Sequence, residues 1–188
     1  MKILMTFFLF VGLLGILGLS SSSVDDGRDD AAQRIAQMYE ENFRLFQGET
    51  NKLAEMAQGP FDLSALREQL AKTRYAFKRV EYLFDYFKTE YNYLYINGAP
   101  LPKINKEDVN GPIVPPNGLQ ALDELVFSEE AETEREKIAA LATSLKERVD
   151  FIVRIHLPLS LSDTQVMEAL RSGIVRVFAL GVTGFDTP

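Results

Sequence analysis

The sequence has 188 residues and is acidic, with 27 Asp and Glu against 20 Lys and Arg and a formal net charge of −7. This balance excludes a nucleic-acid-binding protein, because phosphates select clusters of Lys and Arg. The sequence holds no cysteine. This excludes disulfides, thiolate metal sites and haem attachment through Cys-x-x-Cys-His.

The N-terminal residues have the pattern of an export signal. Lys2 precedes an apolar run over residues 3–19, and the small residues 20–23 follow it. The pattern predicts a signal peptide over residues 1–23 and a periplasmic protein. An uncleaved membrane anchor is the alternative, because a run of about 17 residues is near the lower limit for crossing a bilayer. No other membrane contact is expected.

After a polar lead-in over residues 24–30, a single domain is predicted over residues 31–188. Apolar residues at spacings of three, four and seven predict a first amphipathic helix over residues 31–58. Gly59 and Pro60 end this helix. Asp62 is placed to cap a second helix, which is predicted to run without interruption to Tyr95.

Aromatic residues form two stripes on the second predicted helix. Two neighbouring stripes indicate a helix buried on a wide face inside a bundle. An aromatic box for a ligand is the alternative interpretation. The first stripe comprises Phe77, Phe84, Phe87, Tyr91 and Leu94, and the second comprises Tyr75, Tyr82, Tyr86 and Tyr93.

A proline-rich connection over residues 98–118 is predicted to cross the bundle surface in an extended course. A short helix over residues 118–127 follows, and then a longer helix that ends near Ile155. Ser162 and Gln165 form a capping box that opens the last helix, which is predicted to end at Gly181. Since no strand-like alternation occurs, the predicted fold is all-α, an antiparallel bundle of about five helices.

Three charged residues, Arg74, Lys78 and Glu81, share one side of the second predicted helix. Two interpretations are open. Lys78 and Glu81 would form an ion pair on the surface, or the three residues would form a partly buried polar cluster that contacts the short helix. The second interpretation predicts that one of them lies within hydrogen-bonding reach of Gln120, Asp123 or Glu124.

The polar residues of the short helix allow two interpretations. With Asn117 as the cap, Gln120 would reach back to the N–H of the cap, and Asp123 and Glu124 would complement the helix dipole. Alternatively, Gln120, Asp123 and Glu124 would bind a hard cation together with Glu81, because amide and carboxylate oxygens suit Ca²⁺ and Mg²⁺.

The last helix is apolar on more than one side. A helix of this kind is normally covered by several neighbours. With the sequence ending at Pro188, we expect an exposed apolar patch around Phe178, Val182 and Phe185 that marks an interface.

Four segments in this order resemble the imelysin-like N-terminal region that precedes the di-haem cytochrome c peroxidase module in exported bacterial proteins. The motif Gly118-Leu119-Gln120-Ala121-Leu122-Asp123 is similar to the Gly-x-His-x-x-Glu helix of imelysin-like proteins. The four segments are residues 74–82, 97–101, 116–124 and 176–188.

The resemblance implies a periplasmic α-helical bundle related to proteins of iron uptake. Gly118 matches the glycine of the family motif, Gln120 replaces its histidine and Asp123 replaces its glutamate. Arg74 and Glu81 match the charged pair on the facing helix. The loss of imidazole removes the strongest ligand for a transition metal, so the sequence departs from the family at its metal site.

The resemblance further implies a non-catalytic accessory or docking domain. Its partner would be a di-haem peroxidase module or another periplasmic protein, and the haem module would follow Pro188, so the chain is expected to be a fragment or one part of a split system. No cofactor is expected in this chain apart from a weakly bound metal ion. The alternatives are a stand-alone metal-binding or iron-binding protein of iron uptake and, third, a peptidase.

Overall fold

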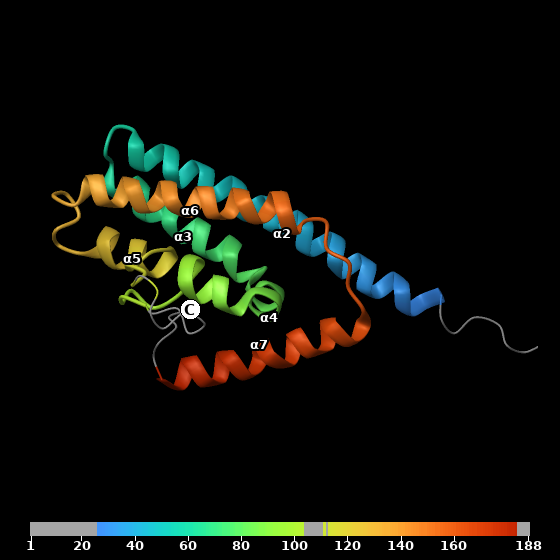
Figure 1. Ribbon diagram of the computed structural model, residues 1–188. Coiled ribbons are helices and arrows are strands. Elements are labelled where there is room, and N and C mark those ends of the chain that lie inside the picture. Colours follow the sequence, from blue (N-terminus) through green and yellow to red (C-terminus); the bar gives the residue numbers. More distant parts are fainter. Residues whose placement is uncertain (1–25, 104–110, 112, 184–188) are drawn as a thin grey trace, which may run out of the picture.

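The computed structural model of the protein describes residues 26–103, 111 and 113–183. Within these ranges the chain forms six α-helices and a short π-helix, which confirms the predicted all-α class (Figure 1). The predicted signal peptide lies outside the described residues. Among the helices described here, none combines the length and the apolar character needed to cross a membrane. The elements are α2 (Asp26–Gln58), α3 (Leu63–Lys78), α4 (Glu81–Tyr91), η1 (Asn92–Ile96), α5 (Leu119–Phe127), α6 (Arg135–His156) and α7 (Asp163–Thr183).

The helices pack as a bundle with one outlying member. α2 lies beside both α6 and α3, and α5 packs against α3 and α6. α7 packs mainly against α4, with a smaller contact to α2, and in Figure 1 it runs along the side of the molecule away from α6. The bundle therefore has its main core between α2, α3, α5 and α6, and α7 is attached to it mainly through α4.

Four phenylalanine rings link the first three helices of the bundle. Phe43 and Phe46 of α2, Phe77 of α3 and Phe84 of α4 form a closed set of ring contacts with centroids 5.2–6.3 Å apart. Contacts at these distances add to the free energy of burial itself. The interpretation of the first aromatic stripe as core is confirmed at Phe77 and Phe84, both of which are buried.

The prediction of one uninterrupted helix over residues 62–95 is wrong. α3 ends at Lys78 and α4 begins at Glu81, and Lys88 within α4 has a non-helical backbone. Helix propensity favours continuation through this segment, but tertiary contacts override it. Val80 is fully buried at the break, and Glu81 is held by partners on other elements. Tyr75 before the break and Tyr93 after it are both exposed, so the second aromatic stripe is not one buried face.

The ends of the helices follow local chemistry. The carboxylate of Asp62 accepts a hydrogen bond of 3.0 Å from the N–H of Ala65, which confirms the predicted cap of α3. Ser162 and Gln165 form the predicted capping box of α7, because each accepts a hydrogen bond from the backbone N–H of the other. α2 begins at Asp26, five residues earlier than predicted, since the acidic lead-in suits a helix N-terminus.

We expect Phe43→Ala to lower the free energy of unfolding by about 3–5 kcal/mol, because it removes a fully buried ring from the aromatic cluster. Urea denaturation followed by circular dichroism measures this loss. Leu45→Ala is the matched control, since Leu45 lies on the same helix and its side chain is 55% exposed. A comparable loss in both variants would contradict the role assigned to the cluster.

Candidate functional site

The carboxylate of Glu81 lies at the centre of a buried polar network. Glu81 is only 8% exposed, although it is charged. Its Oε1 accepts a hydrogen bond of 3.0 Å from Nδ2 of Asn97 and lies 3.0 Å from Nη2 of Arg176. Its Oε2 lies 3.0 Å from Nζ of Lys78. Both interpretations of Lys78 and Glu81 thus hold in part, because they form an ion pair and that pair belongs to a larger cluster.

Arg176 of α7 joins a second carboxylate to this network. Its Nη1 lies 2.6 Å from Oδ1 of Asp85, one turn beyond Glu81 on α4. The same Asp85 oxygen accepts a hydrogen bond of 2.8 Å from Nδ2 of Asn92, the first residue of η1. One guanidinium therefore bridges two carboxylates that other side chains already orient.

The short helix α5 contributes the other end of the network. Asp123 Oδ2 lies 2.6 Å from Nη1 of Arg74 on α3, which confirms the contact expected between these two helices. Gln120 donates a hydrogen bond of 3.1 Å from Nε2 to the carbonyl of Asn97, and the side chain of Asn97 reaches Glu81. Glu124, in contrast, is exposed to solvent.

The expected capping role of Gln120 and Asn117 is wrong. α5 is capped by Gly118, whose φ of 84° lies in the left-handed region that favours glycine. A Cβ at Gly118 would lie 2.4 Å from the carbonyl oxygen of Ile96, so only glycine lets the two chain segments approach this closely. The approach brings the carbonyl of Asn97 to Gln120, while Asn117 donates its own hydrogen bond back to Pro115.

Two of the four residues proposed as metal ligands, Glu81 and Asp123, are engaged by protein cations. Arg74 lies against Asp123, and Lys78 and Arg176 lie against Glu81. Among the described residues, no three His, Cys, Asp or Glu side chains are grouped so as to hold a metal ion. The geometry is that of an internally neutralised polar network, in which each carboxylate already has a positive partner.

A second buried charge lies on the proline-rich connection. Lys103 is buried beside η1, and its Nζ lies 5.7 Å from the ring centroid of Tyr93. Burial lowers the pKa of the Lys103 ammonium below its ordinary value, because the charged form loses its hydration. Its backbone pairs with Val114 across an isolated antiparallel bridge, which joins two parts of the connection to each other.

Sequence reasoning missed Arg176, Asp85 and Asn97 as members of the network. A signal was present for Arg176, because it is a lone charge in the apolar run between Ile174 and Phe178. Asp85 follows Glu81 by four residues, which places the two carboxylates on one helix face. Asn97 gave no such signal, since its role depends on how two segments of the connection cross.

α7 carries its large apolar side chains on the side away from the bundle. Six of them, here called the outer face of α7, are between 41% and 72% exposed. Phe178 is 70% exposed, as expected for the predicted interface, whereas the side chains of Val182 and Phe185 lie outside those that the structure describes. The six are Met167, Leu170, Ile174, Val175, Val177 and Phe178.

The inward side of α7 carries one valine, two small residues and one charge. Val166 and Ala169 are buried, and a Cβ added at Gly173 would lie 3.2 Å from Cβ of Tyr82. The next residue at this spacing is Arg176, which enters the polar network. α7 therefore exposes most of its large apolar side chains and buries mainly small ones, the reverse of an ordinary surface helix.

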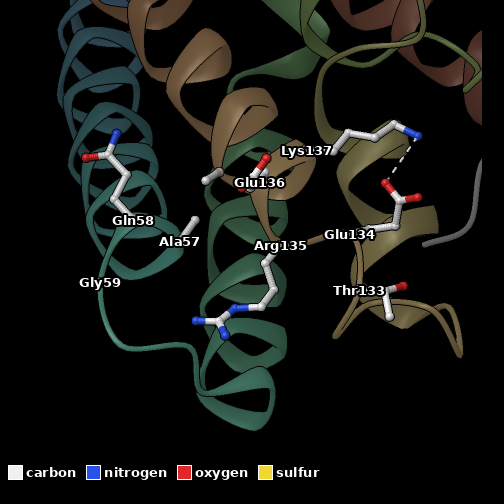
Figure 2. A pocket seen from close by; sticks show the side chains of 9 residues that line it. Ala57, Gln58, Gly59, Thr133, Glu134, Arg135, Glu136 and Lys137 are labelled. Atoms are coloured by element: carbon white, nitrogen blue, oxygen red, sulfur yellow. Dashed lines mark ion pairs between the residues drawn. The ribbon is translucent and has the colours of Figure 1, made fainter.

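One hollow adjoins α7, and a second lies elsewhere on the bundle. A cleft of about 470 Å³ runs between α4 and α7, with mainly apolar walls and with Glu81 and Arg176 among its lining residues. A larger, polar hollow of about 940 Å³ lies at the start of α6. Figure 2 shows Lys137 of this hollow turned toward Glu134, its ion-pair partner at 3.7 Å. The cleft beside α7 is the hollow that adjoins the network.

Comparison of the chain with protein-family models, with curated proteins and with solved structures found no match. The resemblance to the imelysin-like region thus stays a prediction. The proposal for function is built on the network and on the outer face of α7.

We expect the Arg74–Asp123 pair to show a coupling free energy of about 1 kcal/mol, because both side chains are mostly buried. A double-mutant cycle with Arg74→Met and Asp123→Asn, measured by urea denaturation, gives this value. The matched control is Lys72 with Glu68, an exposed pair with a similar distance of 2.7 Å on the same helix. Equal coupling free energies in the two cycles would show that the buried pair stabilises the protein no more than the exposed pair.

Proposed function

We propose that this protein is a non-catalytic periplasmic helical domain that docks onto a di-haem cytochrome c peroxidase module through the outer face of α7. The observation that carries the proposal is the exposure of six large apolar side chains on one helix. Contiguous apolar surface of this kind is uncommon on a soluble monomer and is typical of protein interfaces. An aromatic residue such as Phe178 within such a patch is a typical anchor for binding.

The shape of the surface also supports docking. Met167, Leu170, Ile174 and Val177 recur at spacings of three and four, so they form one ridge along α7. The apolar cleft beside α4 follows the same ridge, because Leu170, Ile174 and Val177 line it. A ridge with an adjacent groove is the shape into which side chains of a partner helix interdigitate.

The partner in this proposal comes from the resemblance to the region that precedes a di-haem peroxidase module. The charge of the chain adds a general expectation, because an acidic protein associates most readily with a partner of basic surface. The role is non-catalytic because the polar network consists of charges that neutralise one another, which suits a structural element.

The alternative of an iron-binding protein has less support from the geometry. To bind a metal, Glu81 would have to exchange the guanidinium of Arg176 and the ammonium of Lys78 for the ion. Asp123 would likewise have to leave Arg74. Removing a carboxylate from a buried pair leaves an uncompensated charge behind, and this cost opposes metal binding.

We expect the double substitution Ile174→Glu and Phe178→Glu to weaken binding to a purified di-haem module by about 30-fold or more, as for the loss of an interface hot spot. Isothermal titration calorimetry measures the affinity. Leu45→Glu is the control, because it adds a carboxylate at an exposed leucine on α2 and should leave the affinity unchanged. If the wild-type protein does not bind the module, the proposed partner is wrong. If the double variant binds as tightly as the wild type, the outer face of α7 is not the docking surface.

We expect the purified protein to bind no haem covalently, because the sequence has no cysteine to form the thioether bonds. The protein should also give no turnover with hydrogen peroxide and a reduced cytochrome. Absorption spectra recorded after dialysis check the first expectation, and stopped-flow oxidation of the cytochrome checks the second. A Soret band that survives dialysis, together with peroxide-dependent turnover, would show that this chain is itself a peroxidase.

A further inference from the structure

The attachment of α7 to the bundle changes in character along the helix. Near its start, Val166 and Ala169 are buried against the neighbouring helices. After Gly173, which lies against Tyr82, the inward position is taken by Arg176. The second half of α7 is therefore joined to α4 by a charged contact. The other helices of the bundle have large apolar residues at the corresponding inward positions.

The charged contact has a geometry that a single ammonium could not reproduce. The two terminal nitrogens of Arg176 reach different carboxylates, with Nη2 at 3.0 Å from Glu81 and Nη1 at 2.6 Å from Asp85. Asn97 and Lys78 orient Glu81, and Asn92 orients Asp85. Both carboxylates thus have partners other than the guanidinium that hold them in place. Charge-assisted contacts of this kind are stronger than neutral hydrogen bonds, and the fork of arginine suits them.

We infer that the contacts of Arg176 with Glu81 and Asp85 form a latch that holds the second half of α7 on the bundle and whose opening releases this half. The remaining bundle keeps its own core, because the aromatic cluster and the contacts of α2 with α3 and α6 do not involve α7. Release of the second half of α7 would then be a local opening at a lower free energy than global unfolding.

The latch is a property of the isolated chain and does not rest on the proposed docking function. It bears on that function, however, because the outer face belongs to the same helix. A partner that binds only the attached form of α7 would stabilise the closed latch by mass action. An open latch would in turn lower the apparent affinity, because fewer molecules would present the face in its attached geometry.

Hydrogen exchange followed by mass spectrometry tests the latch on the full chain without any partner. In Arg176→Met, which keeps an aliphatic stem, we expect the amides of α7 after Gly173 to exchange at least about tenfold faster, equivalent to about 1.4 kcal/mol. The amides of α3 and α6 should keep their rates. Arg171→Met is the matched control, since Arg171 is an exposed arginine on the same helix and its variant should exchange like wild type. Equal acceleration in α6 and α7 would mean general destabilisation and would overturn the latch.

A triple variant separates the latch from the cost of stranded charges. Arg176→Met alone leaves Glu81 and Asp85 without the guanidinium, and this could loosen α7 by repulsion. Combining it with Glu81→Gln and Asp85→Asn removes those charges too. If attraction to Arg176 holds the helix, α7 stays fast-exchanging in the triple variant. Recovery of wild-type protection would overturn the latch, because stranded charge would then explain the single variant.

Discussion

Burying the carboxylate of Glu81 obliges three other parts of the chain to supply its partners. A charge removed from water is tolerated only where opposite charge and hydrogen-bond donors replace the lost hydration. Lys78 provides one partner across the break between α3 and α4, Asn97 a second from the residue after η1, and Arg176 a third from α7. The kinked path from α3 to η1 and the position of α7 both follow from this requirement.

The aromatic cluster and the polar network stabilise the structure in different ways. The rings of Phe43, Phe46 and Phe77 join α2 and α3 without direction, since burial depends on area more than on angle. The network is directional, because each hydrogen bond fixes an angle and a distance. The aromatic cluster thus contributes cohesion to the bundle, and the polar network gives α5 and α7 a specific placement.

Features encoded by neighbouring residues could be predicted from the sequence, and features that need distant residues could not. The caps of α3 and α7 depend on residues three positions apart, and both were predicted correctly. The contact of Arg74 with Asp123 was also foreseeable, because polar residues on two apolar helices need each other. The break at Val80 depends on contacts with α7. The partner of Gln120 depends on where two segments of the connection approach each other. No local sequence pattern encodes either feature.

The large apolar residues that α7 exposes are not the residues that stabilise the fold. Its outward side chains fill no cavity and complete no core, so replacing them changes the free energy of unfolding very little. Mutations at these positions are consequently invisible to selection for stability, which elsewhere purges most changes in apolar residues. The exposed residues of such a helix can change to bind new partners while Gly173 and Arg176 keep the helix in its position on α4. Binding specificity and folding can then evolve independently.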